Sequence, residues 1–83
     1  MTPDQIKSMI ESGIPGAEAH VDGDGSHFVA RVISDDFAEL PVIKQHKMVY
    51  GALGDSMEGA IHALSIQTFT RQAWEKARKF QTL

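Results

Sequence analysis

The chain contains no cysteine, and this absence limits its chemistry more than any other feature of its composition. It cannot form a disulfide or supply a thiolate, so a metal centre held by this chain alone must use histidine and carboxylate ligands. The four histidines include no close pair at the spacing of metal ligands. We therefore expect the isolated protein to bind no metal tightly.

Long apolar runs and catalytic motifs are also missing. No apolar stretch approaches the roughly 20 residues that a membrane span needs. The N-terminus begins with helix-capping residues instead of a basic and apolar export signal, so we expect a cytoplasmic protein that does not contact a membrane. The sequence has no His-Glu-x-x-His motif, phosphate-binding loop or readable serine triad, so we expect no enzymatic activity.

Basic residues are few. The formal net charge is −3 and the pI is near 5.7, which argues against a surface that binds phosphate indiscriminately, although local basic patches remain open. The 83 residues, of which 42% are hydrophobic, fit a single small domain over residues 1–83.

The first half of the chain predicts a helix followed by a β-hairpin. Thr2 and Gln5 form a capping box, and the helix that they begin ends around Gly13 to Gly16. Residues 17–22 alternate in polarity, as in a strand with one wet face. The turn residues 22–26 then lead into a second strand over residues 28–33, so the two strands should pair.

The second half predicts a short helical turn, a long helix, a strand and a last helix. Ser34 caps the short turn, Pro41 opens the long helix, residues 61–69 are β-prone, and Thr70 caps the last helix. The long helix should bury Val42, His46, Val49, Tyr50, Leu53 and Met57, and expose Lys44, Gln45 and Lys47. The resulting order, α-β-β-α-α-β-α, predicts an α+β fold with a three-stranded mixed sheet and helices packed on one side.

Several short motifs, in this order, resemble the BolA/YrbA-like family over most of the chain. They are Ser26-His27-Phe28, Val32-Ile33-Ser34-Asp35-Asp36-Phe37, Lys44-Gln45-His46-Lys47-Met48-Val49-Tyr50, Ile61-His62-Ala63-Leu64-Ser65-Ile66-Gln67-Thr68 and Trp74. The resemblance implies a fold similar to the class II KH domain. It also implies two functional themes.

The first theme is partnership with a monothiol glutaredoxin, in which a [2Fe–2S] cluster is held between the two proteins, with glutathione, or is passed on in iron–sulfur and iron homeostasis. The alternative theme is a DNA-binding transcriptional regulator of stress response and cell morphology. The isolated protein is expected to be a monomer or a weak homodimer without a cofactor.

Two histidines are candidate cluster ligands by this resemblance. His62 occupies the position of the family's C-terminal ligand, and imidazole can replace thiolate on one iron of such a cluster. The family's other ligand, Cys or His, lies in the loop between the first two strands, but residues 21–26 contain neither type. His27 is therefore carried as a substitute. The alternatives are a strand-edge residue for His62 and a cross-strand polar residue for His27.

Other polar residues have structural explanations as well as functional ones. His46 is expected to be a buried neutral residue that donates to a carbonyl or to Ser34 and Asp35. Lys44, Lys47 and Arg71 are candidates for a basic face that contacts a partner or nucleic acid, and solvated charge is the alternative. The KH-type Gly-x-x-Gly loop is absent from the join at residues 36–41, which carries two acidic residues.

Overall fold

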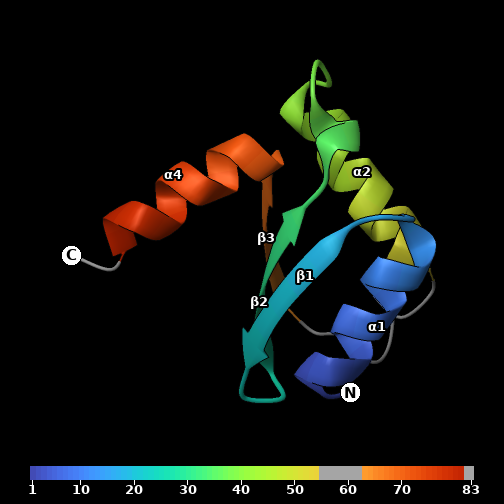
Figure 1. Ribbon diagram of the computed structural model, residues 1–83. Coiled ribbons are helices and arrows are strands. Elements are labelled where there is room, and N and C mark those ends of the chain that lie inside the picture. Colours follow the sequence, from blue (N-terminus) through green and yellow to red (C-terminus); the bar gives the residue numbers. More distant parts are fainter. Residues whose placement is uncertain (55–62, 82–83) are drawn as a thin grey trace.

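The computed structural model describes residues 1–54 and 63–81, so the predictions for Met57, Ile61 and His62 lie outside the described residues. The elements are α1 (Pro3–Gly13), β1 (Glu18–Gly23), β2 (His27–Ile33), the 3-10 helix η1 (Asp35–Phe37), α2 (Val42–Leu53), β3 (Ala63–Phe69) and α4 (Arg71–Gln81) (Figure 1). This order and the mixed sheet confirm the predicted α+β fold.

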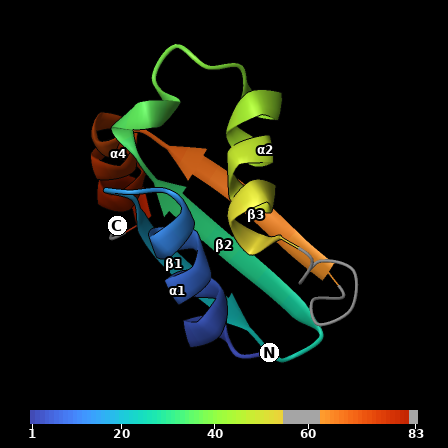
Figure 2. The same cartoon turned by 90° about the vertical axis from the view of Figure 1, so that its right-hand side faces the viewer.

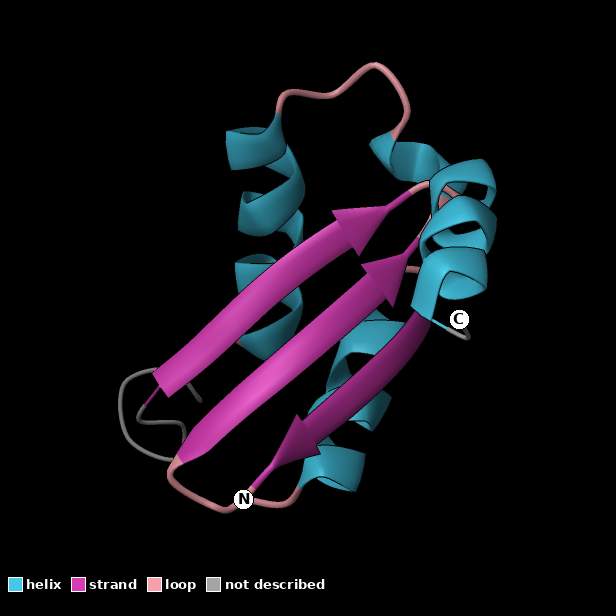
Figure 3. Cartoon of the chain, turned by 90° about the vertical axis from the view of Figure 1, so that its left-hand side faces the viewer, coloured by secondary structure: helices cyan, strands magenta, loops and turns pink. Residues whose placement is uncertain are grey.

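The sheet has the strand order β1-β2-β3 (Figure 3). β1 and β2 form the predicted antiparallel hairpin, with Gly23 opposite Phe28. β2 and β3 run parallel, with His27 opposite Ala63 at one end and Ile33 opposite Phe69 at the other. A parallel pair needs a long crossover, and α2 lies within it. The sequence between β2 and β3 therefore sets the topology.

The helices begin where their capping residues predict. The Thr2 main-chain N–H donates to Gln5 Oε1 at 2.8 Å, and the Gln5 N–H donates to Thr2 Oγ1 at 3.2 Å. Ser34 Oγ accepts from the Asp36 N–H at 3.1 Å, and Thr70 Oγ1 accepts from the Ala73 N–H at 3.2 Å. Each hydroxyl satisfies a backbone donor that the first turn of a helix leaves unpaired.

The core lies between the sheet and the pair α1 and α2, which cover one face of it (Figure 2). Its largest fully buried side chains come from both helices, η1 and β2. They are Phe28, Phe37, Ile6, Ile10, Leu53, Val32 and Val49. The two helices approach closely at Gly13, where an added Cβ would lie 2.5 Å from Ala52 Cβ. Glycine at this position permits the close packing of α1 on α2.

The predicted buried face of α2 is wrong in part. Val49 and Leu53 are buried, but Val42 is 62% exposed and Tyr50 is 42% exposed. Gln45, predicted to be exposed to solvent, is half-buried instead. Its amide nitrogen donates to the Phe37 and Leu40 carbonyls at 3.0 and 2.9 Å, and its amide oxygen accepts from Thr68 Oγ1. Periodicity counts apolar residues, so it does not detect a polar side chain that is buried because carbonyls and a hydroxyl satisfy it.

The prediction that the helices pack on one side of the sheet is wrong for the last helix. α4 leaves the end of β3 and extends on the side of the sheet opposite α1 and α2 (Figures 1 and 2). The Trp74 ring stacks on His20 of β1, with centroids 5.2 Å apart and an angle of 18°, and contacts Phe69 edge-on at 5.2 Å. Arg71 Nη2 also donates to the Gly16 carbonyl at 2.8 Å. These contacts attach the start of α4 to the sheet.

Candidate functional site

The candidate ligand His27 is the first residue of β2 and follows directly on the hairpin turn. Asp24 organises this turn, because its Oδ1 accepts from the main-chain N–H groups of Ser26 and His27, both at 2.9 Å. The Asp24 N–H in turn donates to the His27 carbonyl at 3.2 Å. Aspartate favours such turns because its short side chain reaches backbone donors two and three residues ahead. The backbone that carries His27 is therefore held on both sides.

The Asp24 carboxylate has a pKa below its usual value of 3.8, chiefly because the His27 N–H donates to it, followed by the Ser26 N–H. Hydrogen bonds to the charged form of a carboxyl lower its pKa. The contribution of these bonds to the turn is therefore present above pH 3.8 and is lost as the pH falls through the lowered pKa.

We expect the His27 amide to report this titration. In the acid range, its chemical shift should move with a midpoint below 3.8. A series of 1H–15N spectra against pH measures the midpoint. In Asp24→Asn the acid-range shift should disappear, and persistence of the same titration would show that another group controls the turn.

The His27 side chain is exposed, and it makes no hydrogen bond among the residues that the structure describes. Its Cα partner in β3 is Ala63, which is the residue next in sequence to His62. The other predicted ligand, His62, lies outside the described residues. The register thus places Ala63, which follows His62 in the sequence, beside His27 at the end of the sheet where β2 and β3 begin.

The other two histidines have different surroundings. His20 Nε2 and Glu18 Oε2 are 2.6 Å apart, and this hydrogen bond is the main cause of a lowered Glu18 pKa. His46 is half-buried, and the predicted hydrogen bond to Ser34 or Asp35 is wrong for the described part of the chain, where its side chain has none. Across residues 1–54 and 63–81, no three His, Asp or Glu side chains are grouped so that they could hold a metal ion.

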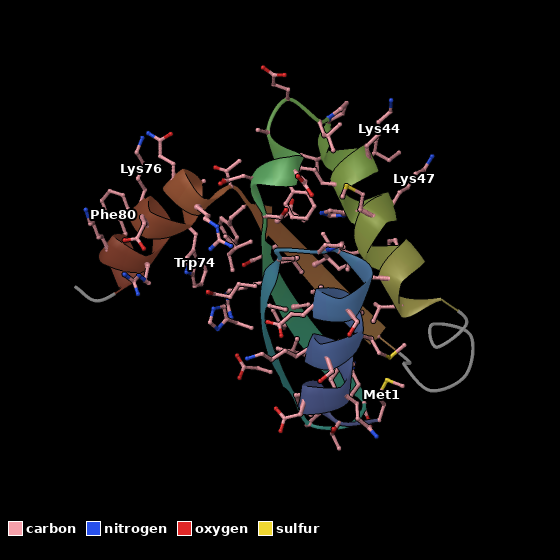
Figure 4. The ribbon with its side chains drawn as sticks, turned by 45° about the vertical axis from the view of Figure 1, so that its right-hand side comes forward. Met1, Lys44, Lys47, Trp74, Lys76 and Phe80 are labelled. Atoms are coloured by element: carbon pink, nitrogen blue, oxygen red, sulfur yellow. The ribbon has the colours of Figure 1, made fainter. Side chains whose placement is uncertain are left out.

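The three predicted basic residues lie on two different elements. Lys44 and Lys47 are exposed on α2, and both point away from the body of the protein (Figure 4). Arg71 begins α4, where its side chain is bonded to the Gly16 carbonyl and its N–H donates to Asp35 Oδ1 at 3.1 Å. Arg71 therefore helps to hold α4 in place, whereas the two lysines extend into solvent.

Sequence reasoning recognised the Asp-Gly-Asp-Gly stretch as a turn but missed how Asp24 holds His27. The signal was available, since an aspartate two and three residues before main-chain donors is typical of a turn that its side chain closes. The stacking of Trp74 on His20 was also missed. No local pattern predicts it, because these residues are 54 positions apart and meet only through the tertiary fold.

The fold and the site together define a class: a small α+β protein with a cysteine-free surface that presents histidine at the start of β2. The model of the BolA-like protein family matches residues 7–73. The chain belongs to this family.

Three relatives illustrate the match. Acid stress protein IbaG of Escherichia coli is 34% identical over 80 residues, which is 95% of each chain. DNA-binding transcriptional regulator BolA of Vibrio cholerae is 41% identical over 54 residues, 65% of this chain and 51% of that protein. The structure of a BolA protein homologue from Coxiella burnetii has a TM-score of 0.84 at 38% identity, covering 90% of this chain and 97% of that one.

Proposed function

We propose that this protein is a partner of a monothiol glutaredoxin and that the two proteins hold, or pass on, a shared [2Fe–2S] cluster. The observation that carries the proposal is the exposed His27 imidazole on a fixed turn. His27 lies beside Ala63, the residue that follows His62 in the sequence. Membership of the BolA-like family supports it, because this partnership is one of the two functional themes that the resemblance implies.

The donor set fits a shared cluster better than a cluster held by this chain alone. A [2Fe–2S] centre needs four protein or small-thiol ligands, and imidazole can replace thiolate on one iron. This chain has no thiolate to give, so it supplies imidazole and the partner supplies sulfur. When bound, the cluster provides one-electron redox chemistry and can be transferred.

The role of this chain is then to present its histidines and to dock. Asp24 holds the His27 backbone through two hydrogen bonds, one accepted by its Oδ1 from the His27 N–H and one donated by its own N–H to the His27 carbonyl, which fixes the backbone from which the imidazole extends. His62 is proposed as the principal ligand, and His27 as the second. The protein contributes no catalytic group in this proposal. Transfer depends on how readily its imidazoles replace the ligands of the glutaredoxin homodimer.

The proposal is tested by titrating the 15N-labelled protein with a cluster-loaded monothiol glutaredoxin. A bound iron–sulfur cluster broadens nearby amide signals, so residues 24–28 and 63–65 should broaden first. Signals from α4 should change least, because this helix begins just after Phe69, at the opposite end of β3 from Ala63. Broadening confined to α2 or α4 would contradict the assignment of the ligand site.

DNA binding is the second candidate function, and one comparison favours it: the Vibrio cholerae relative is named a DNA-binding transcriptional regulator. In this chain the solvent-facing lysines of α2 offer two phosphate contacts, and α4 adds Lys76, Arg78 and Lys79 at exposed positions. The acidic balance of the whole chain opposes binding.

We therefore expect DNA binding to be weak and to fall steeply with salt. Binding that used all five of these contacts would lose about two to three orders of magnitude in affinity between 50 and 200 mM salt, and binding through α2 or α4 alone would lose about one to two. Fluorescence anisotropy with a labelled duplex at the two salt concentrations measures the loss. Tight, sequence-selective binding at the higher salt would make the regulator the better proposal.

A further inference from the structure

The two edges of the sheet differ in how they are protected. The strand order makes β1 and β3 the edge strands, and an edge strand exposes a row of backbone groups that can pair with another strand. On β1, the Ala19 N–H is already occupied, because it donates to Glu11 Oε2 at 3.0 Å. β1 also carries the charged residues Glu18 and Asp22. One donor of this edge is therefore occupied, and its charges oppose pairing with another strand.

The β3 edge has backbone groups that point outward. The Ser34 N–H donates to the Phe69 carbonyl at 2.9 Å, so the backbone groups of Phe69 face β2. Successive residues of a strand direct these groups to alternate sides, which leaves Leu64, Ile66 and Thr68 facing away from β2. Among the described residues, no hydrogen bond reaches the main-chain N–H or C=O of these three.

The sequence of β3 has none of the usual devices that prevent edge pairing. Its seven residues, Ala-Leu-Ser-Ile-Gln-Thr-Phe, contain no charge, proline or glycine. Lysine, proline and inward-pointing charge are the common protections of an exposed edge. β3 therefore presents a neutral template for a further strand.

The flank of α2 adds apolar surface next to this edge. Ala52 meets Gly13, which places α1 on one side of α2. Ile43 and Tyr50, on the other side by helical spacing, are 67% and 42% exposed. α2 lies over the β3 side of the sheet (Figure 2). Two exposed apolar side chains thus border the open edge.

We propose that a second copy of this chain pairs with this edge, antiparallel and around a two-fold axis at Ile66, to give a continuous six-stranded sheet. The pairing sets Ser65 opposite the partner's Gln67 and Leu64 opposite the partner's Thr68. No charged residue meets another across the interface, because β3 has none. A two-fold interface needs a self-complementary surface, and a neutral strand of alternating pattern provides one.

Within the second copy, β3 is the strand that fits this edge best. The occupied N–H and the charges of β1 make it a poor second strand, and no other strand of the described chain is free at an edge. The flanks of the two α2 helices would approach across the axis, which removes Ile43 and Tyr50 from water. The net charge of −3 on each copy opposes association. The dimer should therefore form in a concentration-dependent way.

Sedimentation equilibrium of the full chain tests the proposal. The wild-type mass should rise from 9.1 kDa towards twice that value as the concentration increases. In Ser65→Lys/Gln67→Lys, lysine faces lysine at two pairs, and association should weaken by about tenfold or more. Ser65→Glu/Gln67→Glu should be equally impaired, and an equimolar mixture of the two variants should regain the dimer.

The control variant is Ser12→Lys/Gln72→Lys, which adds the same charge at exposed helical positions and should dimerise like the wild type. Far-UV circular dichroism verifies that each variant is folded. A wild-type protein that stays at 9.1 kDa at millimolar concentration would overturn the proposal and leave the edge to an extended segment of another protein. Undiminished dimerisation of the lysine variant, or failure of the mixture to recover, would also overturn it.

Discussion

His62→Ala is expected to shift the visible spectrum and the reduction potential of the cluster shared with a monothiol glutaredoxin towards those of the glutaredoxin homodimer. The reason is ligand chemistry: replacing a neutral imidazole by thiolate or water changes the charge on the iron and its potential. Anaerobic absorption and circular dichroism spectra of the complex, with a redox titration, measure both effects. A variant complex whose spectrum and cluster lifetime equal those of the wild type would remove His62 from the ligand set.

Two further histidine variants sharpen this experiment. His27→Ala should produce a shift of similar size if His27 is the second ligand, and a smaller one if the hairpin contributes no ligand. His46→Ala is the matched control, since His46 is half-buried on α2 and makes no hydrogen bond among the described residues. It should leave the spectrum unchanged. A spectral shift in His46→Ala would place the cluster near α2 instead.

Gly13→Ala is expected to destabilise the fold by about 1–3 kcal/mol, the usual cost of overpacking. The new Cβ would lie 2.5 Å from Ala52 Cβ and 2.8 Å from Ala52 Cα, and the latter is backbone that cannot rotate away. α1 and α2 must therefore separate. The helix propensity that alanine gains over glycine is at most about 1 kcal/mol and is smaller at the end of a helix, so the clash should dominate.

Gly51→Ala is the matched control because it makes the same chemical change on the facing helix. Apart from the backbone of its own helix and its chain neighbours, no atom lies within 4 Å of a Cβ built at Gly51. This variant should be stabilised by about 0.5–1 kcal/mol through helix propensity alone. Urea unfolding of both variants gives the two free energies. Equal effects, or a stable Gly13→Ala, would show that the close approach of the helices is not needed for stability.

The predicted elements agree closely with the structure because their signals are local. Thr2 with Gln5, Ser34 and Thr70 each cap the helix that they were predicted to begin. The hairpin follows from its turn residues, and the parallel pairing follows from a crossover long enough to hold a helix. Such signals depend on a few neighbouring residues, so the sequence states them directly.

The errors concern side chains whose surroundings come from distant residues. Val42 fits the apolar period of α2 but lies in its first turn and remains exposed. Gln45 breaks the period and is half-buried, because the Phe37 and Leu40 carbonyls and Thr68 satisfy its amide. The placement of α4 depends on the contact of Trp74 with His20. Periodicity and propensity contain no information about these partners.

In the candidate site, too, some features follow from the strand pairing and others do not follow from the sequence pattern. The exposure of His27 and its position beside Ala63 follow from the strand register. The family resemblance, and not any spacing rule, selected His62 and His27 among the four histidines. Their role as cluster ligands stays a prediction until the complex with a partner is measured.

The most direct measurement is anaerobic co-purification of this protein with a monothiol glutaredoxin, followed by the mass and visible circular dichroism of the complex. We predict a heterodimer of one chain of each protein with one [2Fe–2S] cluster, and a dichroism spectrum distinct from that of the glutaredoxin homodimer because imidazole replaces a sulfur ligand. Separate elution of the two proteins, or a complex whose spectrum equals that of the homodimer, would contradict the proposed function.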